Sequence, residues 1–119
     1  MELTEMQARA VGCLVGGAAG DALGYAVEFM QDAAIFRKYG ERGITEYSLS
    51  GGVAEISDDT QMTMFTAEGL ILSGGEEPLR AIYEAYLRWL DTQEREVPRA
   101  DTGLASSLWR RCTAAALRE

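Results

Sequence analysis

Apolar residues recur at helical spacing through the first quarter of the chain. Thr4 followed by Gln7 forms a capping-box pattern, which predicts that a helix begins here. The apolar positions that follow lie three or four residues apart: Val11, Leu14, Val15, Ala18, Ala22, Leu23, Ala26 and Val27. The pattern predicts one long N-terminal helix.

The chain from residue 30 to residue 56 is irregular. We expect a short helix from Asp32 to Tyr39, ended by Gly40. Residues 44–49 can be extended but are too few to establish a sheet.

Helical spacing returns in the second half of the chain. One helix is predicted to begin near Ser57 or Asp58 and to stop before Gly74. Another is predicted to start at Glu76-Glu77-Pro78, where acids and a proline suit a first turn, and we expect its tyrosine and tryptophan residues to lie in the core. A last helix is predicted from about Gly103.

Composition adds a fold class and excludes several functions. The chain has 119 residues, of which 47% are hydrophobic and 25% charged, so we expect a single domain over residues 1–119 with an all-α, helical-bundle fold. The net charge of −8 argues against binding to nucleic acid. Because there is no histidine, acid–base work falls to Asp or Glu, and a metal site must use oxygen ligands, which favours Mg²⁺, Mn²⁺ or Ca²⁺.

Two further features indicate a soluble cytoplasmic protein that does not associate with a membrane. Cys13 and Cys112 lack metal-binding spacing, and we expect both to be buried thiols in a reducing compartment. The N-terminus lacks a positively charged signal region, and Asp21 interrupts the apolar stretch from residue 8 to residue 26.

Four glycines recur every fourth residue along the first predicted helix: Gly12, Gly16, Gly20 and Gly24. Glycine inside a helix costs roughly 0.5–1 kcal/mol relative to alanine, so either another helix or a ligand is expected to approach this bare stripe. Asp21 and Glu28, seven residues apart, lie in the same neighbourhood. They form either a solvated acidic edge or part of a binding site.

The stretch Ile-Ser-Asp-Asp-Thr-Gln at residues 56–61 also has two interpretations. Asp58 followed by Gln61 fits a capping box, and acidic residues suit the first turn of a helix. However, one cap needs one oxygen, whereas Ser57, Asp58 and Asp59 supply three oxygen-bearing side chains. At a junction between loop and helix, such a cluster suits a hard cation.

Taken together, these motifs resemble the ADP-ribosylglycohydrolase family. The similar segments are G-x-x-x-G-D-A-L-G at residues 16–24, V-E-F around Glu28 and I-S-D-D-T-Q-M at residues 56–62, with a looser match at residues 98–103. Their order and spacing make the likeness specific over nearly the whole chain.

The resemblance implies an all-α hydrolase with two Mg²⁺ or Mn²⁺ ions that cleaves the glycosidic bond between ADP-ribose and an acceptor on a protein or small molecule. By the same resemblance, the metal ligands are Ser57, Asp58 and Asp59. Glu28 and Asp59 are the catalytic candidates. The substrate-binding candidates are Gly20, Asp21, Gly24 and Glu28.

One family feature is missing from the sequence. Members carry a second metal-binding segment, D-x-D-[ST], but after Asp101 the only acidic residue is Glu119. We therefore expect a truncated domain that binds metal weakly, turns over slowly or not at all, and is completed by a C-terminal half or a partner chain. The alternatives are a non-enzymatic ADP-ribose-binding or structural module of the same family, or another Mg²⁺-dependent phosphohydrolase.

Overall fold

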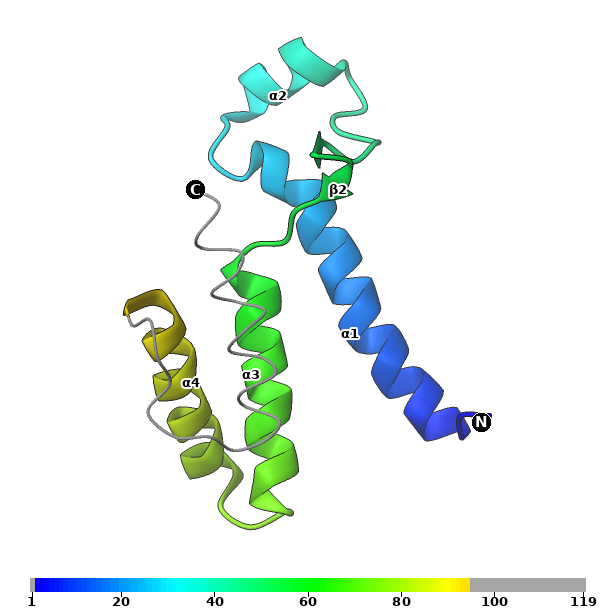
Figure 1. The fold of residues 1–119 in the computed structure, drawn as a ribbon. Helices are drawn as coiled ribbons and strands as arrows, with labels where there is room; N and C mark the ends of the chain where they lie inside the picture. The colour runs from blue at the N-terminus through cyan, green and yellow to red at the C-terminus, as the bar shows by residue number, and fades with distance from the viewer. Residues whose placement is uncertain (1, 95–119) are drawn as a thin grey trace. The chain divides into compact units, whose positions relative to one another are not determined.

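The computed structural model describes residues 2–94, and the all-α expectation is confirmed there (Figure 1). The chain divides into two compact units, Met1–Thr60 and Gln61–Glu119, and each is described by itself. The elements in chain order are α1 (Glu5–Gly24), the 3₁₀ helix η1 (Tyr25–Val27), α2 (Asp32–Tyr39), β1 (Leu49–Ser50), β2 (Val53–Ala54), α3 (Asp58–Ser73) and α4 (Pro78–Glu94).

The first unit begins with the predicted long helix. The capping box is confirmed, because the Gln7 amide donates to Thr4 Oγ1 over 3.3 Å and the Thr4 amide donates to Gln7 Oε1 over 2.9 Å. Within the described residues, Glu5–Val27 is also the one helix whose length and composition would allow it to cross a membrane. Core helices of soluble proteins and N-terminal signal sequences pass the same test.

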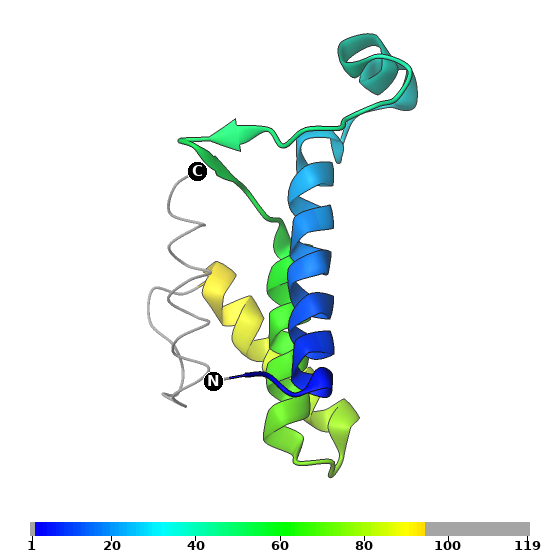
Figure 2. The ribbon, with the colours of Figure 1, turned by 90° about the vertical axis from the view of Figure 1, so that its right-hand side faces the viewer.

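After α1 the chain forms a short helix and a small hairpin (Figure 2). Helix α2 has the predicted bounds and ends at Gly40, whose φ of +86° suits a residue without a side chain. The stretch at residues 44–49, expected to be extended but too short to establish a sheet, contributes only Leu49 to strand pairing, which joins Leu49 to Ala54 and Ser50 to Val53.

The second unit begins at Gln61, within α3, and in it α3 and α4 lie side by side and antiparallel (Figures 1 and 2). Gly69 is what allows their close approach, because a Cβ atom there would lie 2.8 Å from Ile82 Cα. Phe65 and Ala85 are fully buried at this contact. The bounds of α3 agree with the sequence prediction.

Hydrogen bonds between side chains also join α3 to α4. Glu68, which is 1% exposed, accepts two hydrogen bonds on Oε2 from the Arg88 guanidinium, over 2.8 and 3.1 Å. Trp89 Nε1 donates to Gln61 Oε1 over 3.0 Å. The helix pair is therefore held by a small apolar core with paired polar groups beside it.

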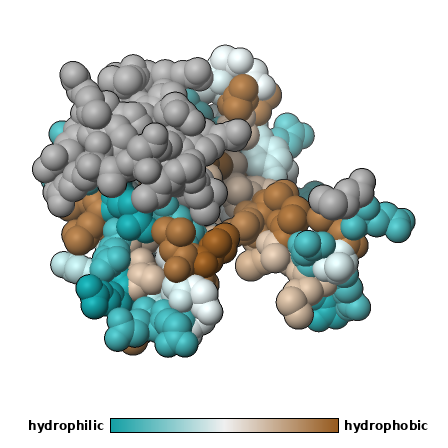
Figure 3. Space-filling model, turned by 60° about the horizontal axis from the view of Figure 1, so that its bottom comes forward, coloured by the Kyte–Doolittle hydropathy of each residue, from teal (hydrophilic) through white to brown (hydrophobic). Residues whose placement is uncertain are grey.

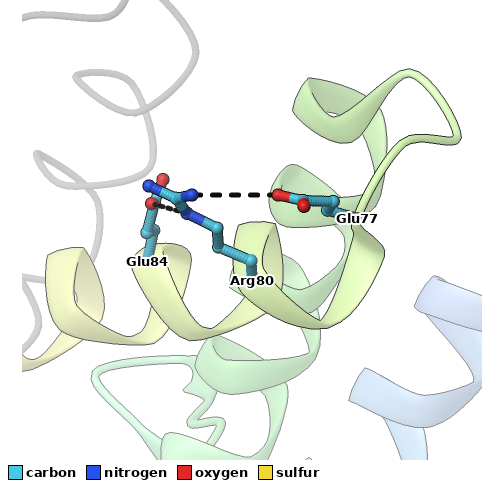
Figure 4. Close-up of polar contacts among 3 residues, drawn as sticks. All are labelled: Glu77, Arg80 and Glu84. Atoms are coloured by element: carbon cyan, nitrogen blue, oxygen red, sulfur yellow. Dashed lines mark hydrogen bonds and ion pairs between the residues drawn. The ribbon is translucent and has the colours of Figure 1, made fainter.

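The surface of α4 carries an ion-pair network (Figure 4). Arg80 Nε lies 3.1 Å from a carboxylate oxygen of Glu84, and Arg80 Nη1 lies 3.8 Å from one of Glu77. All three side chains are at least half exposed, so solvent screens these pairs and they contribute little to stability.

Several sequence expectations about burial are wrong. Cys13 is exposed, and Tyr83 of α4 is 63% exposed although Tyr86 and Trp89 pack against the core. Figure 3 shows apolar side chains beside polar ones on one face of the molecule, and the exposed apolar residues include Leu79 at 84%. A helical period predicts which residues share a face, but not whether another element covers that face. The predicted helix from Gly103, the second cysteine and the 98–103 motif lie outside the described residues.

Candidate metal and substrate site

The structure brings Asp21, in the last turn of α1, against the beginning of α3. Asp21 Oδ1 accepts a hydrogen bond from Ser57 Oγ over 2.7 Å. Asp21 Oδ2 accepts three more: from the Ser57 amide over 2.9 Å, from Thr60 Oγ1 over 2.5 Å and from the Thr60 amide over 3.3 Å. One carboxylate thus binds both residues, which follow it by 36 and 39 positions.

Ser57 is the residue that caps α3. Its Oγ accepts a hydrogen bond from the Asp59 amide over 3.1 Å, and the helix begins at Asp58. The expected capping box between Asp58 and Gln61 is therefore wrong, and Gln61 Oε1 instead accepts hydrogen bonds from side chains of α4. Serine and aspartate are both good caps, so composition alone did not decide between the two neighbours.

The environment of Asp21 favours its charged form. Partial burial, the largest single influence, acts to raise the pKa of its carboxyl. The hydrogen bonds from Thr60 and Ser57 act in the opposite direction, and together they lower the pKa of Asp21 below its usual value. Asp21 is therefore an anion that the start of α3 stabilises, since the N-terminal end of a helix attracts negative charge.

The predicted metal ligands are close in sequence at this helix start. Ser57 is buried, at 7% exposed, whereas Asp58 and Asp59 are exposed in the first turn. Within residues 2–94, no three Asp, Glu, Cys or His side chains are gathered as a metal site. Ser57, Asp58 and Asp59 nevertheless fit part of a metal site, because carboxylate and hydroxyl oxygens suit Mg²⁺ and Mn²⁺.

The other predicted site residues lie at or near the end of α1. Glu28 caps η1 through its backbone, with its amide donating to Tyr25 O over 3.3 Å, and its side chain is exposed. At Gly20 and Gly24, no described atom lies within 4 Å of where a Cβ would be. The same holds at Gly12 and Gly16, so neither of the two expected approaches to the glycine stripe, by another helix or by a ligand, is tested by the described residues. A ligand on the stripe stays a prediction.

Thr60 is the functional-site residue that sequence reasoning missed. It is 8% exposed, and both its amide and its hydroxyl bind Asp21. A signal was present: Ser57 and Thr60 are three residues apart, which places two hydroxyls on one side of a helix start. Nothing in that spacing identified the acceptor in a distant helix.

Comparisons with known proteins agree with the motifs. The sequence model of the ADP-ribosylglycohydrolase family matches residues 2–119. The chain is 34% identical over 94 residues to the ADP-ribosyl-[dinitrogen reductase] glycohydrolase of Rhodospirillum rubrum, an alignment that covers 75% of this chain and 31% of that protein. The chain thus spans about a third of that relative's length. No solved structure matches this chain. The chain belongs to the ADP-ribosylglycohydrolase family.

Proposed function

We propose that this chain carries one half of the active site of a hydrolase that releases ADP-ribose from a protein or a small molecule. The observation that carries the proposal is the acidic first turn of α3, with Ser57 buried and bonded while Asp58 and Asp59 are exposed beside it. Family membership supports the reaction class.

In this proposal Ser57, Asp58 and Asp59 hold Mg²⁺ or Mn²⁺. When bound, the ion supplies positive charge that orients ribose hydroxyls and polarises water. Three side chains are too few for one octahedral shell, so further ligands must come from water, substrate or another segment. We propose a longer chain or a partner chain as that source, which leaves the present chain a slow catalyst.

Carboxylates perform the proton transfers in this proposal, because the chain has no histidine. Glu28, exposed after η1, is our first candidate for the general acid or base, with Asp59 as the second candidate. Gly20 and Gly24 leave the backbone of α1 open to a nucleotide.

We also propose that the protein acts in the cytoplasm. The hydrogen bonds of Asp21 to Ser57 and Thr60 place a charged group and two polar partners at the end of α1. A carboxylate of this kind is costly within a bilayer, which favours α1 as a helix of a soluble protein.

A single-turnover assay tests the reaction. The chain is incubated in excess over a protein carrying ADP-ribosylated arginine, with Mg²⁺ or Mn²⁺, and free ADP-ribose is quantified by chromatography. We expect slow release that EDTA abolishes and that Glu28→Gln reduces by at least about 100-fold. Glu77→Gln, an exposed acid just before α4, is the matched control.

The alternatives give different results in the same assay. Release that is unaffected by EDTA and by Glu28→Gln would contradict the proposed mechanism. Binding of ADP-ribose by calorimetry without metal and without hydrolysis would favour a binding module. Cleavage of nucleotide or sugar phosphates instead would favour a phosphohydrolase.

A further inference from the structure

The hydroxyl of Ser57 has a defined hydrogen-bond arrangement. A serine hydroxyl has one proton to donate and two lone pairs. The proton of Ser57 Oγ is directed to Asp21 Oδ1 over 2.7 Å, and one lone pair accepts the Asp59 amide proton over 3.1 Å. One lone pair is left, and its direction is fixed by the other two bonds.

The hydrogen bonds that Asp21 accepts leave its carboxylate few lone pairs with which to contact a substrate. It accepts four from Ser57 and Thr60, about the number that a carboxylate can accept. Little capacity is left for a ribose hydroxyl or for direct coordination of a cation.

We propose that Asp21 is a positioning residue, which orients the free lone pair of Ser57 Oγ toward a divalent cation held with Asp58 and Asp59. This inference rests on the proposed function and assigns Asp21 to the support of the ligands rather than to substrate. Groups that hold metal ligands in place typically change metal affinity by about 10- to 100-fold when they are replaced.

Asp21→Asn is the informative substitution, because it is isosteric. Its single carbonyl oxygen best replaces Oδ2, which accepts three of the four hydrogen bonds. The amide group then faces Ser57 Oγ and donates to it, so both lone pairs of the hydroxyl are used and its proton turns outward. Ser57 can no longer coordinate a cation, although the local fold is kept.

The test is titration of the chain with Mn²⁺ alone, followed by calorimetry or by the electron paramagnetic resonance of free Mn²⁺. We expect Asp21→Asn to weaken binding at least about 10-fold, with helical content unchanged by circular dichroism. Asp32→Asn, an exposed acid in the first turn of α2, is the matched control and should bind as the unsubstituted chain does.

Two variants separate positioning from stability. Thr60→Val also removes a hydrogen bond to Asp21 but leaves the bond from Ser57 Oγ, so it should weaken Mn²⁺ binding less than Asp21→Asn. In a Ser57→Ala background, Asp21→Asn should have no additional effect, because the group that it orients is gone. Equal affinity of Asp21→Asn and the unsubstituted chain, or additive losses in the double variant, would overturn the proposal.

A measurement on the unsubstituted chain distinguishes positioning from direct ligation. If Asp21 keeps its hydrogen bonds when metal binds, saturating Mg²⁺ leaves hydrogen exchange of the Ser57 and Thr60 amides slow. Faster exchange with Mg²⁺ would show that Asp21 leaves these amides to bind the ion, which overturns the positioning role. Absence of any Mn²⁺ binding by the unsubstituted chain would instead contradict the proposed function itself, together with this role.

Discussion

Two carboxylates, those of Asp21 and Glu68, are held by different means. Asp21 is half-buried and accepts four hydrogen bonds from uncharged donors on Ser57 and Thr60. Glu68 is buried with a side chain that is 0% exposed, and its Oε2 receives the guanidinium of Arg88, which is 25% exposed. Its Oε1 is buried without a hydrogen-bond partner among the described residues.

The difference shows what each arrangement can do. Amide and hydroxyl donors are directional and belong to one helical turn, so they give Asp21 control over the orientation of a short segment. The guanidinium instead supplies the countercharge that a buried carboxylate requires. We therefore expect changes at Glu68 and Arg88 to alter stability, and changes at Asp21 to alter local geometry and metal binding.

The largest effect on stability is expected from breaking the buried pair. Arg88→Met leaves the carboxylate of Glu68 buried without its cation and should lower the free energy of unfolding by roughly 3 kcal/mol. Replacing both residues by methionine should recover most of that loss. Urea unfolding measures the stability of the single and the double variant. If Arg88→Met were as stable as the double variant, the carboxylate of Glu68 would not need the cation of Arg88.

The next effect concerns the close contact between α3 and α4. Gly69→Ala places a Cβ 2.8 Å from Ile82 Cα and should destabilise the chain by about 1–3 kcal/mol. Gly16→Ala meets no described atom within 4 Å and should stabilise α1 by roughly 0.5–1 kcal/mol. Thermal unfolding of the two variants should therefore shift in opposite directions. Equal shifts would mean that the glycines do not differ in packing.

A smaller, pH-dependent effect is expected at Asp21. Asp21→Asn should lower the free energy of unfolding by about 1 kcal/mol near neutral pH. Because the pKa of Asp21 is lowered in the folded state, its stabilisation is complete above the unfolded pKa of about 3.9. It is lost as the pH falls through the folded value. The stability difference between the chain and this variant should thus narrow on acidification, and a constant difference would refute the charge-based account.

The smallest effect is expected at the surface of α4. Arg80→Met removes the exposed pairs with Glu77 and Glu84 and should change the free energy of unfolding by less than about 0.5 kcal/mol. This variant is the exposed counterpart of Arg88→Met. If Arg80→Met and Arg88→Met lowered the free energy of unfolding by similar amounts, buried and exposed ion pairs would not differ in this chain.

The local parts of the fold were predictable from sequence. The capping box at Thr4 and the end of α2 at Gly40 depend on residues only a few positions apart, and both are confirmed. Burial was less predictable: exposed Cys13 and Tyr83 lie on apolar patterns that no described element covers. Periodicity defines a face, and only tertiary packing decides what contacts it.

The candidate site was predictable in its residues but not in its connections. Sequence motifs identified Asp21 and Ser57 separately, and the resemblance assigned one to substrate and the other to metal. Their hydrogen bonds span 36 residues, and no periodic pattern reports a contact at that separation. The part played by Thr60 depends on that same contact, which is why it became visible only in the structure.

The central claim is that the first turn of α3 is a divalent-cation site, and paramagnetic broadening by Mn²⁺ tests it most directly. Trace Mn²⁺ is added to the isotopically labelled chain, and the loss of each amide signal is followed by NMR. We predict that the signals of Ser57, Asp58 and Asp59 disappear first, and that Asp58→Asn removes this selectivity. Equal broadening at the exposed acids Glu76 and Glu77, or no selectivity at all, would contradict the claim.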